Sequence, residues 1–176
     1  MKTQLETKRL ILRPITTADT KDFFELDSNP EVHKYLGNKP VKSIKESEVM
    51  IADILEQYKT NGLGRLAIID KKTLNFIGWA GLKYEQNLRK AFNYYDIGYR
   101  LKQHYWGKGY ATEAAIASLK HGFEDLKLKE ICAAAAQNHI VSNTILKKIG
   151  MQPSGTFQYK NELCNWYVIN CNSKKN

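Results

Sequence analysis

A glycine-containing segment at residues 104–115, HYWGKGYATEAA, most constrains what this chain can fold into. The preceding run, Tyr94–Leu101, is rich in aromatic and β-branched residues, which is typical of a strand, and apolar residues recur at helical spacing after the segment. Because Gly107 and Gly109 have no side chains, backbone N–H groups can approach a bulky anion there, and the positive end of the helix dipole faces the same place. Lys108 adds positive charge. We therefore predict a phosphate-binding loop at residues 106–112, called the cradle below.

Two common phosphate-binding motifs do not match the cradle. A Walker A loop needs Ser or Thr directly after Gly-Lys, but Lys108 is followed by Gly109. A dinucleotide-binding fingerprint needs a third Gly or an Ala where this chain has Thr112. No acidic residue ends the next strand-like run, residues 131–136, where a ribose partner would be expected. The cradle therefore predicts another class of phosphate ligand.

Length and composition set the outer limits. The 176 residues fit one domain, 1–176 with a core of about 8–172, which should bury roughly 70% of its unfolded surface. There is no apolar run of signal-peptide length at the N-terminus, so we expect a cytoplasmic protein without membrane association. The three cysteines are odd in number and not closely paired, so we expect neither a disulfide framework nor a metal site.

The net charge is positive, with 27 Lys and Arg against 18 Asp and Glu, or +9. This sign favours polyanionic ligands. The basic residues are scattered along the chain instead of lying on one element, which favours a solvated surface over a docking patch for nucleic acid. We therefore expect no direct nucleic-acid binding, and a basic ribosome- or RNA-associated protein remains an alternative.

Turn residues and hydrophobic periodicity divide the chain into strand and helix signals. We expect strands at Leu10–Pro14, Leu66–Ile69, Phe76–Tyr84, Tyr94–Leu101, Ile131–Ala136, Gly155–Tyr159 and Cys164–Cys171. We expect helices through Leu26 after caps at Thr16, Thr17 or Asp19, from the cap Ser43 to just before Asn61, from the cradle to Leu126, and from Ser142 to Ile149. The second helix should bury a stripe of Val49, Ile54, Leu55 and Tyr58.

This order of elements, with the cradle in its centre, resembles the GNAT superfamily of N-acetyltransferases, and within it the Rim-type branch of ribosomal-protein-alanine acetyltransferases. Further pieces support the resemblance: Glu6–Pro14, Gly78–Gly81, Asp96–Tyr99 and Ser142–Met151. The resemblance implies an α/β (α+β) fold. It would consist of a single mixed, mostly antiparallel twisted sheet of about seven strands with a central splay, flanked by about four helices.

The resemblance implies acetyl-coenzyme A (acetyl-CoA) as the acetyl donor. Its pyrophosphate would bind backbone N–H groups of Trp106, Gly107, Lys108, Gly109, Tyr110, Ala111 and Thr112. Its pantetheine arm would lie alongside the main chain of Tyr99, Arg100 and Leu101, as in strand addition.

The chain departs from the family pattern at two histidines. His104 stands where the family usually has Gln or Arg, and His139 stands where it usually has an Asn that contacts pantetheine. Either His139 or the neighbouring Asn138 could make that contact, and both histidines could equally be surface residues without a role.

Acetyl transfer also needs a proton donor for the departing thiolate. Many members of the superfamily use a Tyr where this chain has Leu146, and the family alignment places Ser142 near the thiol. The Ser142 hydroxyl can donate a hydrogen bond, although Ser is also a common helix N-cap.

For the base or water-orienting group we predict Glu162, with Asp96 as the other carboxylate and with His33 and Tyr35 as alternatives near the first helix pair. A carboxylate that removes a proton would need its pKa raised by burial.

The sequence thus predicts an N-acetyltransferase that moves the acetyl group of acetyl-CoA directly to a primary amine. The acceptor would be a protein N-terminus, for example of a ribosomal protein, or a small-molecule amine, and the enzyme would be a monomer or a homodimer. A CoA-binding module without catalysis is the second alternative, because of Leu146, His104 and His139.

Overall fold

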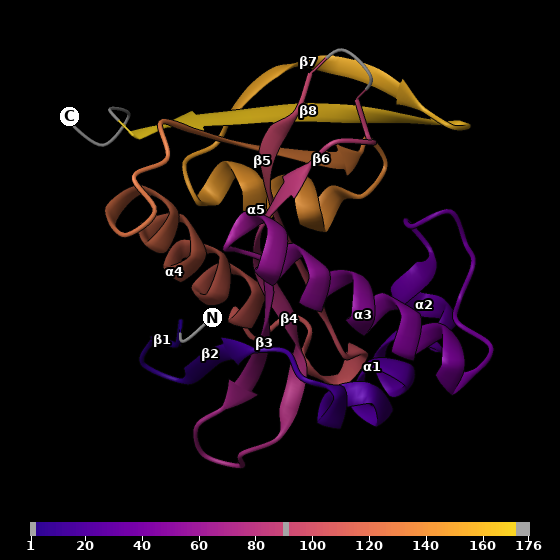
Figure 1. The fold of residues 1–176 in the computed structure, drawn as a ribbon. Helices are drawn as coiled ribbons and strands as arrows, with labels where there is room; N and C mark the ends of the chain where they lie inside the picture. The colour runs from indigo at the N-terminus through magenta and orange to yellow at the C-terminus, as the bar shows by residue number, and fades with distance from the viewer. Residues whose placement is uncertain (1–2, 90–91, 172–176) are drawn as a thin grey trace.

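A computed structural model describes residues 3–89 and 92–171 (Figure 1). Its centre is an eight-stranded sheet in the order β1-β2-β3-β4-β5-β6-β8-β7. The strands are β1 (Leu5–Glu6), β2 (Leu10–Pro14), β3 (Arg65–Asp70), β4 (Phe76–Glu85), β5 (Tyr94–Leu101), β6 (Glu130–Ala136), β7 (Gln152–Tyr159) and β8 (Glu162–Asn170). All neighbours are antiparallel except β5 and β6, so the expected mixed, mostly antiparallel sheet is confirmed. Residue 172, the expected end of the core, lies outside the described residues.

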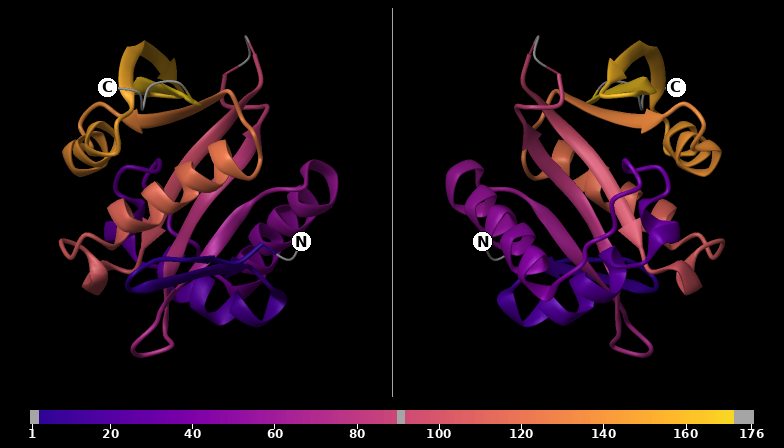
Figure 2. Two further views of the ribbon diagram at one scale, coloured as in Figure 1. Left: turned by 90° about the vertical axis from the view of Figure 1, so that its left-hand side faces the viewer. Right: turned by 90° about the vertical axis from the view of Figure 1, so that its right-hand side faces the viewer.

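Helices cover both faces of this sheet. They are α1 (Thr20–Asp27), α2 (Pro30–His33), α3 (Ile44–Asn61), α4 (Tyr110–Glu124) and α5 (Ile140–Lys148), with short 3-10 turns η1 (Thr17–Asp19) and η2 (Gln103–Tyr105). The edge-on views of Figure 2 show α4 and α5 on one side of the sheet and α1 and α3 on the other. None of the helices in the described ranges is both long and apolar enough to cross a membrane.

The sheet opens between β5 and β6. The two parallel strands pair at Asp96 and Cys132 alone, whereas β5 pairs with β4 from Tyr94 to Leu101. Beyond Asp96, the β5 edge from Ile97 to Leu101 therefore faces no strand on the β6 side. We call this gap the splay, and it is the central splay that the sequence predicts.

The alanine-rich strand β6 forms despite the low β preference of alanine. It pairs with β8 along its whole length, from Glu130–Asn170 to Ala136–Cys164. Alternate residues of β6 pack on opposite faces. Ala133 lies in the core under α4 and α5, and Ala134 packs on the other face against a cluster of Tyr94, Cys132 and Trp166. Packing on both faces therefore decides the conformation here, where local propensity does not.

Helix α3 begins after Ser43, as expected, and includes Asn61, one residue beyond the expected end. Gly62, whose φ of 69° is left-handed, is its C-cap. The predicted stripe is wrong at Val49, which is 62% exposed, while Ile51 is buried in its place. At 3.6 residues per turn, Val49 points roughly 200° away from Ile51 and so faces solvent.

The counts of elements differ slightly from expectation. The additional strand β1 has two residues and the additional helix α2 has four, which is too short for either to show a periodic pattern. Pro30 follows the end of α1 at Asp27 and opens α2 at its first turn, where a missing N–H costs nothing.

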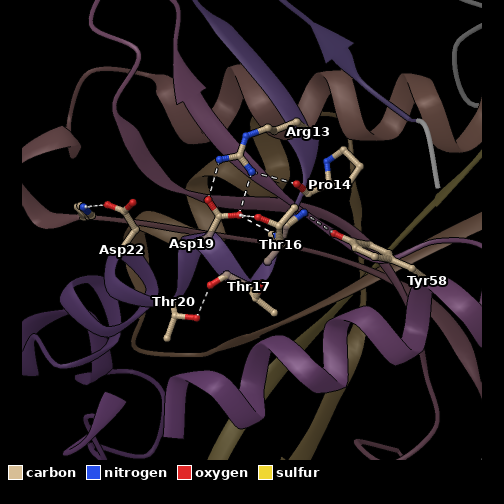
Figure 3. A network of polar contacts seen from close by, with 10 residues as sticks. Arg13, Pro14, Thr16, Thr17, Asp19, Thr20, Asp22 and Tyr58 are labelled. Atoms are coloured by element: carbon tan, nitrogen blue, oxygen red, sulfur yellow. Dashed lines mark hydrogen bonds and ion pairs between the residues drawn. The ribbon is translucent and has the colours of Figure 1, made fainter. Parts of the chain in front are cut away.

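A polar network anchors the start of α1 (Figure 3). The Arg13 guanidinium donates two hydrogen bonds to the Asp19 carboxylate, at 2.7 and 2.9 Å, and the Thr16 N–H donates to the same carboxylate at 2.8 Å. The Tyr58 hydroxyl of α3 accepts from the Ile15 N–H at 3.0 Å. These bonds fix α1 against β2 and α3, and thereby fix the position of its last residue beside β5.

Candidate active site

The cradle joins the end of β5 to the start of α4 and has the backbone conformation that its glycines permit. Gly107 has a φ of 72° and Gly109 a φ of 77°, both in the left-handed region where a side chain is unfavourable. A Cβ at Gly107 would meet no atom within 4 Å, so the space in front of it is open. The two glycines therefore turn the backbone without filling the space where a ligand would approach.

The backbone donors of the cradle are unpaired from Gly107 onward. The Trp106 N–H donates to the Gln103 carbonyl at 3.0 Å, so its predicted contact with the pyrophosphate is wrong. Within the described residues, none of the N–H groups of residues 107–112 has a hydrogen-bond acceptor. Gly109 caps α4 without a side-chain bond, so the positive end of a 15-residue helix adds to the same field. Such consecutive free donors at a helix start suit a phosphate group.

The N-terminal segment braces the cradle. The Glu113 carboxylate accepts hydrogen bonds from the Thr7 hydroxyl at 2.6 Å and from the Arg9 N–H at 2.9 Å, and it forms an ion pair with the Arg9 guanidinium at 2.6 Å. Arg9 also donates to the Lys108 carbonyl at 2.9 Å and lies 4.2 Å from the centre of the Tyr110 ring. These contacts give Glu113 a structural role and place a second cation, Arg9, beside Lys108. The sequence signals did not indicate Arg9.

The remaining side chains near the cradle have separate contacts. The Trp106 indole is 43% exposed and donates to the Leu101 carbonyl at 2.8 Å, which fixes the turn that follows β5. A pocket of about 390 Å³ opens between α1, α2 and η2. It is lined by Glu25, Leu26, Asn29, Val32, Lys102, Gln103 and His104.

Ser142 meets Tyr99 across the splay. The Tyr99 hydroxyl lies 3.2 Å from both the hydroxyl and the carbonyl oxygen of Ser142. Burial raises the pKa of Tyr99 to about 12, against the opposing effect of the Ser142 hydrogen bond, so the phenol keeps its proton at neutral pH. Ser142 and Tyr99, both predicted site residues, thus lie in contact. The sequence had indicated only the main chain of Tyr99, whereas the structure places its side chain in the site as well.

Ser142 is not the N-cap of α5, so that alternative is wrong. The helix begins at Ile140, with His139 as the N-cap. The buried Asn143 amide holds this earlier start by donating to the carbonyls of Ala136 at 2.9 Å and His139 at 2.8 Å. Ser142 is therefore free of capping and faces Tyr99 from the first turn.

The two candidates for the pantetheine contact differ in their surroundings. The Asn138 side chain is exposed, whereas the half-buried His139 ring stacks on Tyr35 with centroids 4.2 Å apart and an interplanar angle of 10°. Burial lowers the pKa of His139, which favours the neutral ring. This stack links α5 to the segment after α2.

Comparison with known proteins agrees with this architecture. The family profile described as "Acetyltransferase (GNAT) domain" matches residues 9–152, more than half of the 176 residues. The chain belongs to the GNAT acetyltransferase family. It is 34% identical over 161 residues to YoaA, an uncharacterized N-acetyltransferase of Bacillus subtilis (strain 168), with 89% of each chain covered.

Solved structures share this GNAT fold. A GNAT-family acetyltransferase from Bacillus anthracis has a TM-score of 0.79 and 26% identity, over 96% of this chain and 99% of that one. A ribosomal-protein-S5-alanine acetyltransferase from Vibrio fischeri gives 0.78 and 18%, over 97% and 98%. A spermidine N-acetyltransferase from Vibrio cholerae, solved with CoA and spermine, gives 0.76 and 17%, over 95% and 98%. The last two show likeness of fold alone.

The carboxylates considered for this GNAT chain as bases lie on one face of the sheet. Asp96 forms a buried ion pair with Arg65 where β5 and β6 part, and burial raises its pKa against the opposing effect of Arg65. Uptake of a proton by Asp96 would leave the buried guanidinium without a counter-charge, which opposes a catalytic role. The half-buried Glu162 opens β8, and its carboxylate makes no hydrogen bond or ion pair within the described residues. Its register through Cys164 and Ala136 places it on the Asp96 face.

A polar cluster that the sequence signals missed lies on the same face, under α1 and α2. Asp27, at the end of α1, is fully buried and pairs with the Arg100 guanidinium of β5. The same Asp27 oxygen lies 3.4 Å from Nε2 of the buried His33. The Arg100 guanidinium also lies 5.0 Å from the centre of the Trp79 ring. An Asp among the buried residues of α1, beside Phe23 and Leu26, was the signal that could have indicated this cluster.

Proposed function

We propose that this GNAT chain transfers the acetyl group of acetyl-CoA to a primary amine by direct attack. The observation that supports the proposal best is the row of unpaired backbone N–H groups in the cradle, at the end of the free β5 edge. The pyrophosphate and the extended, amide-bearing arm of acetyl-CoA need these two features side by side.

The chain's own groups define how the donor would bind. The N–H groups of residues 107–112 would donate hydrogen bonds to the pyrophosphate oxygens, with Arg9 and Lys108 as nearby cations. The main chain of Tyr99 to Leu101 would pair with the amides of the arm along the splay. When bound, the thioester supplies an activated acetyl group, and backbone donors at the free β5 edge would polarise its carbonyl.

Ser142 and Tyr99 would complete the transfer. As the amine nitrogen bonds to the carbonyl carbon, the bond from carbon to sulfur breaks and the thiolate takes up a proton. The Ser142 hydroxyl would donate that proton, and the Tyr99 hydroxyl, 3.2 Å away, would hold it in place. Leu146 cannot replace them, because its side chain, buried in the core at 2% exposure, has no hydrogen-bonding proton to give.

The cysteines favour direct attack over a covalent enzyme intermediate. Cys132 and Cys164 are buried, and burial raises the pKa of Cys132 to about 12 and also raises that of Cys164. A thiol with a raised pKa is a poor nucleophile at neutral pH. Cys171 is exposed and follows the end of β8.

For the acceptor we propose a primary amine on a protein N-terminus or on a small molecule such as a polyamine. Structural neighbours named for a ribosomal-protein alanine and for spermidine support both classes. A Rim-type acceptor and a cytoplasmic site of action are part of this proposal. A screen that measures thiol release with an alanine-initiated peptide, spermidine and free amino acids distinguishes the classes.

The proposal is tested by a glycine substitution in the cradle. Acetyl-CoA at about 100 times its dissociation constant should add ~2.7 kcal/mol to the stability of the wild-type protein. Gly107→Val should abolish this thermal shift, because a β-branched side chain would stand where the pyrophosphate approaches. Gly62→Val is the matched control, since Gly62 has a φ of 69° and open space around it but ends α3 away from the cradle.

The outcomes separate the alternatives. A thermal shift without thiol release from any amine would indicate a CoA-binding module without catalysis. Retention of the full shift in Gly107→Val would contradict the role of the cradle. RNA binding with a steep salt dependence, and no response to acetyl-CoA, would instead favour the basic RNA-associated alternative.

A further inference from the structure

We infer that His33, oriented by Asp27, takes the proton from the acceptor amine. The inference rests on the proposed function and assigns the base of the same site. Its starting point is the pair formed by Asp27 and His33, in which the Asp27 Oδ1 and His33 Nε2 atoms lie 3.4 Å apart. This distance is long for a hydrogen bond, and such contacts commonly tighten when substrate binds.

The pair lies beside the splay. Asp27 contacts Arg100, whose main chain borders the gap on the β5 side. Two residues beyond His33, Tyr35 stacks on His139, the N-cap of α5 on the opposite side of the gap. Ser142 lies three residues after His139, in the first turn of α5, so the segment that carries His33 contacts the helix that carries the proposed proton donor.

Several polar atoms in this cluster lack partners. Within the described residues, the buried atoms Asp27 Oδ2, His33 Nδ1, His33 Nε2 and Trp79 Nε1 have no hydrogen bond. Buried polar groups are rarely left this way, and so many in one place indicate a site that a polar ligand or water completes. The N–H groups of a protonated acceptor amine could donate hydrogen bonds to Asp27 Oδ2 and to the unprotonated nitrogen of His33, which have no donor otherwise among the described residues.

The surroundings of His33, burial first among them, favour its neutral form. Burial lowers the pKa of His33, Arg100 from β5 lowers it further, and Asp27 from α1 opposes both. The ring is therefore unprotonated at neutral pH and able to accept a proton. With Nε2 facing Asp27, we assign the N–H to Nε2 and the free electron pair to Nδ1.

The proton balance is complete without another reactant. The acceptor ammonium gives one proton to His33 Nδ1, and the neutral amine then bonds to the acetyl carbon. The proton that leaves the nitrogen as the amide forms goes to solvent, while the thiolate is protonated by Ser142, which regains a proton from solvent. The Asp27 carboxylate stabilises the protonated His33, which returns its proton to solvent before the next turnover.

The test compares rate–pH profiles with an alanine-initiated peptide and with spermidine as acceptors. His33→Gln should lower kcat by ~10²-fold and remove the acidic limb of kcat, since general base help is worth ~10²–10⁴-fold. Any limb of the rate–pH profile that reports the ionisation of the acceptor amine should be the same in wild type and variant, because the acceptor is the same in both. His121→Gln is the matched control: it removes a histidine paired with Asp125 at 2.7 Å on α4, and its kcat should equal that of wild type.

Two further measurements keep the inference testable if His33→Gln fails to fold. The pKa of His33 in the wild-type protein, followed by NMR, should equal the pKa of the acidic limb of kcat. In Asp27→Asn both values should move to lower pH, because the carboxylate that favours the protonated ring is gone.

An active wild-type enzyme in which His33→Gln retains its acidic limb, with kcat within about twofold of wild type, would overturn the inference and leave acetyl transfer standing. Disagreement between the NMR and kinetic pKa values would do the same. If the wild-type protein released no thiol with any amine, the proposed function and this inference would fall together.

Discussion

At the scale of single residues, the role of Ser142 depends on where α5 starts, which is two residues before the start expected from the sequence. Because α5 starts at Ile140, the Ser142 hydroxyl bonds to Tyr99 and not to the helix start. Ser142→Ala should therefore lower kcat by ~10²-fold while the unfolding free energy falls by no more than about 1 kcal/mol. Steady-state kinetics paired with a thermal melt measure both, and Thr144→Ala, an exposed hydroxyl on the same helix, is the control.

Glu162 has a different expected role from His33. Its carboxylate opens β8 on the face that carries Asp96 and is not held by any partner within the described residues. We predict that Glu162→Gln raises the KM of a cationic acceptor such as spermidine and leaves the acidic limb of kcat unchanged, because the loss of charge weakens binding only. A lost acidic limb would instead return the base assignment to Glu162.

At the scale of elements, Asn143 ties three of them together. Its amide donates to β6 and to the start of α5, and its oxygen accepts from Asn165 at 2.7 Å and from Tyr167 at 2.8 Å in β8. This junction sets where the first turn of α5, with His139 and Ser142, faces the splay.

Asn143→Ala should lower the unfolding free energy by about 2–3 kcal/mol, because the buried Tyr167 hydroxyl loses its acceptor. It should also reduce kcat, since the start of α5 loses its anchor. Urea denaturation with Thr144→Ala as the reference measures the first effect. A change below about 0.5 kcal/mol would show that water replaces the amide.

At the scale of the whole molecule, buried carboxylates couple folding to pH. The pKa of Asp19 is lowered: burial opposes the shift, and the Arg13 ion pair and Thr16 N–H outweigh it. A lowered folded-state pKa gives stability that is present above the unfolded value, near pH 4, and is lost as pH falls through the folded value.

Asp19→Asn should therefore cost about 2 kcal/mol at pH 7 and flatten the fall in stability below pH 4. Urea denaturation at pH 7, 4 and 3 measures both effects. The stability deficit of the variant should shrink at the lowest pH. A constant deficit at every pH would show that the carboxylate charge is not what stabilises the start of α1.

The sequence by itself determined the features that depend on neighbouring residues. Short-range sterics and periodicity predict the strand Tyr94–Leu101, the turn at the two glycines of the cradle and the start of α3 after Ser43. The structure has each of them, and both glycines are left-handed. The short elements β1 and α2 give no such pattern.

Only the tertiary structure decided which distant side chains meet. Arg100 reaches Asp27 across 73 positions of sequence, and Tyr99 reaches Ser142 across 43. Neither contact leaves a local signal, because each arises from how α1 and α5 pack against a sheet that opens between β5 and β6. A one-residue shift in a helix or strand would turn these side chains away, so their meeting depends on the register of the whole sheet.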